Sequence, residues 1–411
     1  MIKNNLVLYS GILISVLTLI GVALGHYPRM RMNRATISLI GATILILIGA
    51  INIEAAYSAI DLNTLILIFS MMILNVNLRI CGFFNIVSTK IIAVAKTPNQ
   101  LLLFIVFSSG ILSGLFLNDT IVLMFTPIIL EIVIALKRNP IPYLIALATS
   151  ANVGSAATIV GNPQNMLIGI FSGISFVDFS ISLIPVSLAG LLIIWVIIKY
   201  FYKEEFTRIK FQHQFSANPF IYKPLLIKST ISLLFMLIGF IAGMPIPITA
   251  LSAASLLLFT RRIKPERVFR EIDWSLLIFF ASLFIITSTL NNLLFQGQNF
   301  GVDKNIDFKG IINLAIISTL LSNVVSNVPA VLLLNPIISS INDNRVAWLV
   351  ISMATTFAGN LTLLGSVANM IVAESASKSG VKLKFIEYMK TGIPITIITI
   401  FIGIIWFAVL M

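Results

Sequence analysis

The chain has 411 residues, of which 58% are hydrophobic and only 10% are charged, and its formal net charge is +12. A soluble domain carries about 25% charged residues, so a chain this apolar cannot cover a water-facing surface. The basic excess does not indicate a nucleic-acid partner, because the basic residues gather in short loops between apolar runs, as the positive-inside rule requires.

Long apolar runs recur along the chain, and a helix needs about 20 such residues to cross a bilayer. The runs are continuous rather than alternating, which predicts spanning helices and excludes a membrane β-barrel. The first run is interpreted as a helix rather than a removed secretory signal, because basic rather than small residues follow it. The runs are Leu6 to Gly25, Thr36 to Ile53, Asn63 to Phe84, Phe179 to Ile198, Leu226 to Gly243, Trp274 to Leu293 and Ile393 to Leu410.

Loop charges predict the direction of each span. Arg29, Arg31 and Arg34 follow the first span, so this loop is expected in the cytoplasm and the N-terminus outside. The next loop contains Glu54 and Asp61 and no basic residue, and it is expected outside. Basic residues then return the chain to the cytoplasm.

The segment Leu101 to Leu136 starts and ends on the cytoplasmic side, because basic residues flank both ends. Its 36 residues are few for two full spans and a turn, and its middle is the polar sequence Asn118-Asp119-Thr120. We therefore predict a re-entrant hairpin that dips to mid-membrane. The next crossing, Ile141 to Phe176, has a polar interruption at Gly161 to Asn165.

The second half of the chain repeats the first, which predicts repeat 1 at residues 1–202, a cytoplasmic linker at 203–225 and repeat 2 at 226–411. On this alignment Asn118 falls on Asn327. Matching segments are Ile60-Asp61-Leu62 with Ile272-Asp273-Trp274, Thr126-Pro127-Ile128-Ile129 with Asn335-Pro336-Ile337-Ile338, Gly161-Asn162-Pro163-Gln164-Asn165-Met166 with Gly365-Ser366-Val367-Ala368-Asn369-Met370, and Thr158 with Thr362.

Loop charges reverse between the halves, and an odd number of crossings inserts the second half upside down. The uncharged turn Met244 to Pro247 corresponds to the basic first loop, and the basic stretch Arg261 to Arg270 corresponds to the acidic second loop. The predicted fold is an all-α polytopic membrane protein with two inverted-topology repeats, each of about five transmembrane helices and one re-entrant hairpin. Both termini are expected outside.

Two hairpin tips and two interrupted helices hold the polar residues that we predict to bind a solute. Backbone groups there lose their helical hydrogen bonds and need water, ions or side chains, and helix N-termini starting at Asp119 and Val328 would direct partial positive charge at a substrate. The alternative is that these polar residues only glue helices together. The candidate substrate- and ion-binding residues are Asn118, Asp119, Thr120, Asn162, Pro163, Asn165, Ser326, Asn327, Thr362, Ser366 and Asn369.

Asp119 is the candidate coupling residue, because an acid at membrane depth is costly and usually functional. It would bind a cation or exchange a proton; the alternative is a shallow tip at which Asp119 is a solvated helix cap. Four aromatic residues near the ends of spans are predicted to be interfacial anchors rather than ligands: Tyr57, Tyr143, Trp274 and Trp348.

No enzyme signature is present: the chain has no phosphate loop, no dinucleotide motif and no His/Cys metal spacing. We therefore expect no catalytic residue, no metal centre and no cofactor, and transport that ATP does not drive on this chain. Coupling to Na⁺ or H⁺ is the simplest expectation, with Na⁺ held at Asn118, Asp119 and Asn327.

The chain resembles the ion transporter superfamily, which includes citrate-type carriers, arsenite permeases and divalent-anion/sodium symporters. The resemblance covers nearly the whole chain and depends on Asn118-Asp119-Thr120, on Gly161 to Asn165 and on their second-half counterparts. It implies ion and substrate sites at tips and broken helices, and a homodimer. Dicarboxylate symporters have Ser-Asn-Thr at both tips, whereas this chain has Asp119 in the first and Val328 in the second, as in arsenite-permease or cation-antiporter branches.

Three hypotheses follow. The first is an ion-gradient-coupled secondary transporter of a small anion, an inorganic oxyanion or a carboxylate, which works by alternating access with its site near the midplane. The second is a sodium/proton antiporter of the same fold, and the third is a channel or membrane scaffold subunit. The lipid bilayer and a small anionic solute are the expected partners, and the cell (inner) membrane is the expected location.

Overall fold

The computed structural model describes residues 2–25, 32–206, 211, 221–259, 264–295 and 307–410. Within these ranges every regular element is a helix, and the helices are named α1 to α19. Nine of the helices described are long and apolar enough to cross a membrane. The predicted all-α, polytopic architecture is confirmed.

The helices of the first repeat follow the predicted order of spans, hairpin and interrupted crossing. They are α1 (Ile2–Leu24), α2 (Arg34–Leu47), α3 (Ile53–Ala59), α4 (Leu62–Ile80), α5 (Phe83–Val94), α6 (Pro98–Leu115), α7 (Asn118–Ala135), α8 (Pro140–Ser155), α9 (Pro163–Ser172) and α10 (Phe176–Phe201).

The second repeat has the same order, except that α5 has no counterpart among the described residues. Its helices are α11 (Lys223–Ile241), α12 (Ile246–Leu258), α13 (Pro265–Arg270), α14 (Trp274–Phe295), α15 (Phe308–Val325), α16 (Asn327–Ser339), α17 (Arg345–Ala358), α18 (Val367–Lys378) and α19 (Phe385–Leu410).

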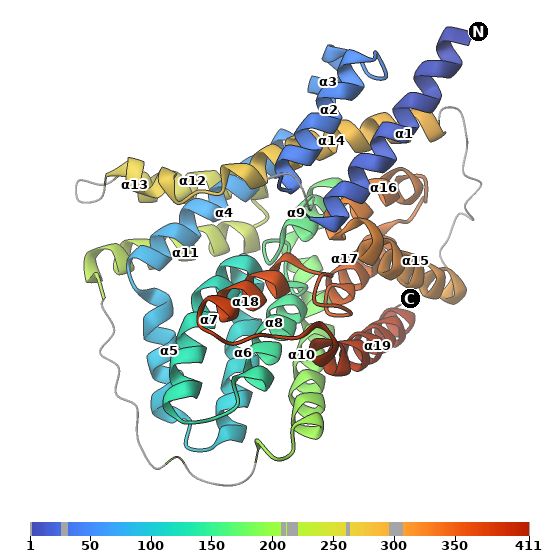
Figure 1. Ribbon diagram of the computed structural model, residues 1–411. Coiled ribbons are helices and arrows are strands. Elements are labelled where there is room, and N and C mark those ends of the chain that lie inside the picture. Colours follow the sequence, from blue (N-terminus) through green and yellow to red (C-terminus); the bar gives the residue numbers. More distant parts are fainter. Residues whose placement is uncertain are drawn as a thin grey trace.

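The contacts between helices stay equivalent when the two repeats are interchanged (Figure 1). Helix α2 packs against α14, and their counterparts α12 and α4 pack against each other. Helix α7 packs against α18 while α16 packs against α9, and the equivalent helices α10 and α19 contact one another. Each contact thus has a partner contact in which the halves change roles, as a pseudo-twofold relation between inverted repeats requires.

The hairpin tip meets the middle of the interrupted crossing. Phe116 and Leu117 join α6 to α7, and the backbone N–H of Asn118 donates to the carbonyl of Gly161 at 3.0 Å. Each arm has 18 residues, or about 27 Å of helix, so the arms reach farther than a half-membrane dip alone requires.

Two of the four predicted interfacial anchors, Tyr57 and Trp274, are exposed, whereas the prediction is wrong for Tyr143 and Trp348. The side chain of Tyr143 is buried and its hydroxyl donates to Glu205 at 3.0 Å. Trp348 is also buried, and its ring packs against Phe171 with centroids 6.4 Å apart. Both residues lie near helix ends, but they face neighbouring helices, which sequence position alone does not reveal.

Parts of the predicted topology lie outside the described residues. These include Arg29, Arg31, Arg261 and Arg262, and most of the linker at 203–225. The linker is described at 203–206, 211 and 221–225, and α11 already begins at Lys223.

Candidate functional site

The first interruption lies between α8 and α9 and is built by local sequence. Pro163 has no backbone N–H and occupies the first turn of α9, while the Asn162 side chain caps this helix by accepting from the backbone N–H of Asn165 at 2.8 Å. Gly161 is required because a Cβ there would lie 2.1 Å from the carbonyl oxygen of Ser155. The interruption covers residues 156–162 and so starts earlier than the predicted Gly161.

Asn165 satisfies the carbonyls that the interruption frees. Its Nδ2 donates to the carbonyls of Ser155 at 3.1 Å and Thr158 at 3.0 Å. Its Oδ1 accepts from the hydroxyl of Ser352 at 2.8 Å. The side chain is fully buried, so this amide holds the broken helix together and has no free group for a solute.

The second interruption, between α17 and α18, repeats this arrangement. Ser366 caps α18, and Asn369 Nδ2 donates to the carbonyls of Gly359 at 2.7 Å and Thr362 at 3.1 Å. Asn369 thus contacts Thr362 as Asn165 contacts Thr158, which agrees with the predicted alignment of the halves.

Asn152, near the end of α8, joins the first tip to the second interruption, and it is absent from the sequence-predicted residues. Its Oδ1 accepts from Asn118 Nδ2 at 3.1 Å and from the Ser366 hydroxyl at 3.0 Å. Its Nδ2 donates to Asn360 Oδ1 at 2.9 Å and Asn369 Oδ1 at 3.0 Å. The amide thus makes four bonds, three of them to the other repeat.

Thr356 occupies the matching place at the end of α17. Its hydroxyl accepts from Asn162 Nδ2 and from Gln164 Nε2, each at 3.3 Å. Each repeat therefore contacts the interruption of the other, with an asparagine on one side and a threonine on the other. Two sequence signals could have identified Asn152: the polar segment Ser150 to Ser155 that leads into the interruption, and the equivalence with Thr356.

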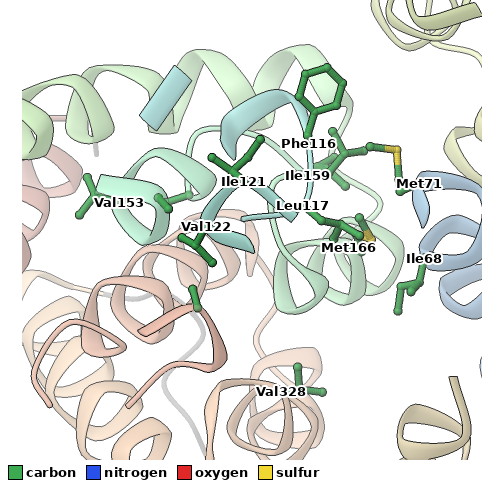
Figure 2. Packing of buried hydrophobic residues seen from close by; sticks show 14 of the residues in the cluster. Ile68, Met71, Phe116, Leu117, Ile121, Val122, Val153, Ile159, Met166 and Val328 are labelled. Carbon is green, nitrogen blue, oxygen red and sulfur yellow. The ribbon is translucent and has the colours of Figure 1, made fainter. Parts of the chain in front are cut away.

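An apolar cluster holds the first tip against the first interruption (Figure 2). Phe116 and Leu117 of the tip lie beside Ile159 of the interruption and Met166 of α9, and Met71 of α4 faces them. All five side chains are buried. The backbone at the tip is therefore fixed by packing on both sides.

A cavity of about 200 Å³ lies beside this tip, between α4, α7, α14 and α18. Three predicted residues, Asp119, Thr120 and Pro163, line it. Arg79 and Glu271 line it too and form an ion pair between the repeats. The other lining residues are Met72, Asn75, Val76, Leu117, Leu123, Asp273, Leu276, Val367 and Ile371.

The second tip differs from the first. Ser326 has φ +79°, in the left-handed region that favours glycine, and Asn327 Oδ1 accepts from the hydroxyl of Ser322 at 2.6 Å. Neither Ser326 nor Asn327 lines the cavity. Helices α7 and α16 begin one residue before the predicted Asp119 and Val328.

The predicted residues therefore fall into three groups. Asp119, Thr120 and Pro163 line the cavity. The side chains of Asn118, Asn162, Asn165, Ser366 and Asn369 bond to protein groups around it. Ser326, Asn327 and Thr362 stay with the second repeat's own tip and interruption.

Two inverted repeats whose hairpin tips meet interrupted helices at the centre define a multi-pass membrane protein of the transporter class. The sequence profile of the citrate transporter family (CitMHS) matches residues 16–358. The chain belongs to this family, which confirms the resemblance to the ion transporter superfamily and to its citrate and arsenite-permease branches.

Similar proteins cover nearly the whole chain. The silicon efflux transporter LSI3 of Oryza sativa subsp. japonica is 27% identical over 92% of this chain and 93% of its own length. The putative transporter arsB of Dictyostelium discoideum is 25% identical over 92% of this chain and 87% of its own length. A 46 kDa membrane protein of Mycobacterium leprae is 28% identical over 90% and 92%.

The fold is similar to that of the YdaH transporter of Alcanivorax borkumensis, whose crystal structure was described as having an unusual topology. The TM-score is 0.60 at 12% sequence identity, and the match covers 99% of this chain and 98% of the other. At this identity the likeness supports the fold alone.

Proposed function

We propose that this protein is an ion-gradient-coupled secondary active transporter of a small anion, either an inorganic oxyanion or a carboxylate. The observation that carries the proposal is that three helix N-termini meet at the cavity. The first turns of α7, α9 and α18 contribute Asp119 and Thr120, Pro163, and Val367 to its wall. The N-terminus of a helix carries a partial positive charge, which favours an anion.

The charged side chains of the cavity suit coupling to a cation. Arg79 is paired with Glu271, so its charge is already balanced. Asp119 makes no salt bridge within the described ranges and adds a negative charge at the N-terminus of α7. A proton or cation on Asp119 would remove the electrostatic repulsion between its carboxylate and an entering anion. Binding of the cation would therefore favour binding of the anion, which couples their transport.

Alternating access would expose the cavity to each side of the membrane in turn. The cavity reaches Arg79 at the end of α4 and Glu271 after α13. The predicted topology assigns both positions to the cytoplasmic side, so we propose an inward-facing conformation. Location in the inner membrane, external termini and a homodimer belong to the same proposal.

Reconstituted protein tests the transport proposal directly. Proteoliposomes are assayed for uptake of labelled silicate, arsenite and citrate under imposed proton and sodium gradients. Silicon and citrate are named by a relative and by the family, and arsenite follows from the resemblance to arsenite permeases. Uptake of one of them that collapses when the gradient is abolished is the expected result. A sodium-driven pH change that needs no anion would instead support the sodium/proton antiporter.

Asp119→Asn is expected to lower gradient-driven uptake at least tenfold, because a neutral amide can neither exchange a proton nor balance a cation. Asp178→Asn is the matched control, since Asp178 also lies in the first turn of a helix but is about half exposed and outside the cavity. Uptake and its pH dependence are measured for both variants. If Asp119→Asn left both unchanged, Asp119 would have no coupling role.

A further inference from the structure

Asn75 is a buried amide on α4 whose carbonyl oxygen accepts no hydrogen bond from any described residue. The residue is 2% exposed, and its Nδ2 donates to the Thr120 hydroxyl at 3.3 Å. Its Oδ1 has no hydrogen-bond partner in the part of the chain that the structure describes. A buried acceptor without a partner is destabilising and rare in folded proteins, which indicates that a ligand completes it.

Asn75 lines the same cavity as Thr120 and Asp119. The amide oxygen, the hydroxyl oxygen and the carboxylate therefore face one space from two helices, α4 and α7. An ionised carboxylate accepts hydrogen bonds but donates none. The missing ligand of this corner is consequently a cation or a strong donor.

Two of the three residues that the sequence assigned to such an ion, Asn118 and Asn327, do not line the cavity. Oδ1 of Asn118 accepts from the backbone N–H of Asp119 at 3.0 Å, outside the cavity lining. Oδ1 of Asn327 accepts from Ser322 at 2.6 Å, away from the cavity. Of the three predicted sodium ligands only Asp119 lines the cavity, and Asn75 and Thr120 line it too.

We propose that Asn75, Thr120 and Asp119 bind Na⁺ in the wall of the cavity. The proposal rests on the proposed transport function and names its coupling ion. Carboxylate, amide and hydroxyl oxygens are ligands that hard cations prefer. Asp119 supplies the negative charge of this corner, and Asp273, which lines the same cavity, likewise makes no salt bridge within the described ranges. No three acidic, histidine or cysteine side chains cluster among the described residues, so the ligands of this corner are mainly neutral oxygens.

The position of this corner explains how the ion would act. Asn75 belongs to α4, whereas Thr120 belongs to the hairpin arm α7. A cation shared by them would tie the tip to α4 and would neutralise Asp119 at the edge of the anion's space. Binding of Na⁺ would then favour binding of the anion, and the effect is reciprocal.

Thermal unfolding of the purified, substrate-free protein tests the site without transport. NaCl replaces choline chloride at constant ionic strength, and KCl serves as the second cation. At 100 times the dissociation constant, Na⁺ is expected to raise Tm by an amount on the order of 3 °C. KCl is expected to give little or no shift.

Two substitutions at Asn75 and a matched control assign the effect. Asn75→Leu should remove the sodium-dependent shift, while Asn75→Asp, which keeps an oxygen at this position, should retain or enlarge it. Asn77→Leu is the control, because Asn77 is buried on the same helix, donates to the carbonyl of Ile73 at 2.8 Å and lies outside the cavity. This variant should keep the shift whatever its own Tm.

The outcomes separate this site from the transport function. No sodium-dependent shift in the wild type, or an equal shift in Asn75→Leu, overturns the site. Loss of the shift in Asn75→Asp also overturns it, because the amide would then act as a donor to an anion. Proton-driven uptake without a sodium shift leaves the transporter standing, whereas a sodium shift without anion uptake leaves the site standing.

Discussion

Gly154→Ala is expected to abolish transport and to lower the yield of folded protein severalfold. A Cβ on Gly154 would lie 2.1 Å from the carbonyl oxygen of Gly110 and 2.4 Å from its Cα. These are backbone atoms of the hairpin arm α6, so α6 must move as a whole away from α8. Overpacking typically costs about 1–3 kcal/mol, and a clash with backbone belongs at or above the top of that range.

The expected loss of transport results from displacement of the hairpin tip, not from a direct role of Gly154 in binding. Small residues let membrane helices approach closely, and here they set the distance between α6 and α8. The tip at Phe116 and Leu117 continues directly from α6, so a displaced arm moves the tip away from the interruption that it contacts. Transport should therefore fall even in the fraction that folds.

Gly114→Ala is the matched control, one turn along the same contact. Its Cβ would lie 3.1 Å from the carbonyl oxygen of Gly154 and 3.6 Å from Ala157, which a shift of a few tenths of an ångström relieves. Size-exclusion profiles in detergent and proteoliposome uptake are compared for both variants. Equal behaviour of the two would show that the α6–α8 distance is not the limiting feature.

Most of the architecture could be predicted from the sequence because its signals are local or periodic. Continuous apolar runs predicted the long spans, and the Gly161-Asn162-Pro163 sequence predicted a broken helix. The start of the interruption at Ala156 was missed, because Ala156 to Val160 contains no helix breaker. The short helices α3, α5 and α13 were missed because they do not cross the membrane on their own.

The site was only partly predictable, because its geometry depends on contacts distant in sequence. Asn75 and Asn152 are each one of several polar residues in a mainly apolar helix, and nothing local tells which of them faces the cavity or the other repeat. Their partners lie 45 residues away for Asn75 and more than 200 residues away for the Asn152 bonds to the other repeat. The amides near Pro163 were predicted from the sequence to bind a solute, yet several of them form hydrogen bonds with protein groups instead.

Asn165→Ala is expected to destabilise the protein by about 3 kcal/mol or more and to abolish transport. The side chain makes bonds to the carbonyls of Ser155, Ala156 and Thr158 and accepts from two hydroxyls of α17. Alanine leaves the Ser155 and Ala156 carbonyls without the donor that they have in the described part of the chain, at about 1–3 kcal/mol for each buried unsatisfied group. The Thr158 carbonyl keeps only the backbone N–H of Gly161 at 3.4 Å. The interruption would then have to close or admit water, and either change alters the cavity wall at Pro163.

The repeat gives this prediction an internal comparison, because Asn369→Ala removes the equivalent amide. Asn369 makes fewer bonds, to the carbonyls of Gly359 and Thr362 and from Asn152, and Thr362 is only half-buried. Its loss should cost less, about 2 kcal/mol. Asn63→Ala, the same change at an exposed position, should stay within about 0.5 kcal/mol of the wild type. Thermal unfolding of the three variants gives the order, and an Asn165→Ala protein as stable as Asn63→Ala would mean that the interrupted helix does not depend on this amide.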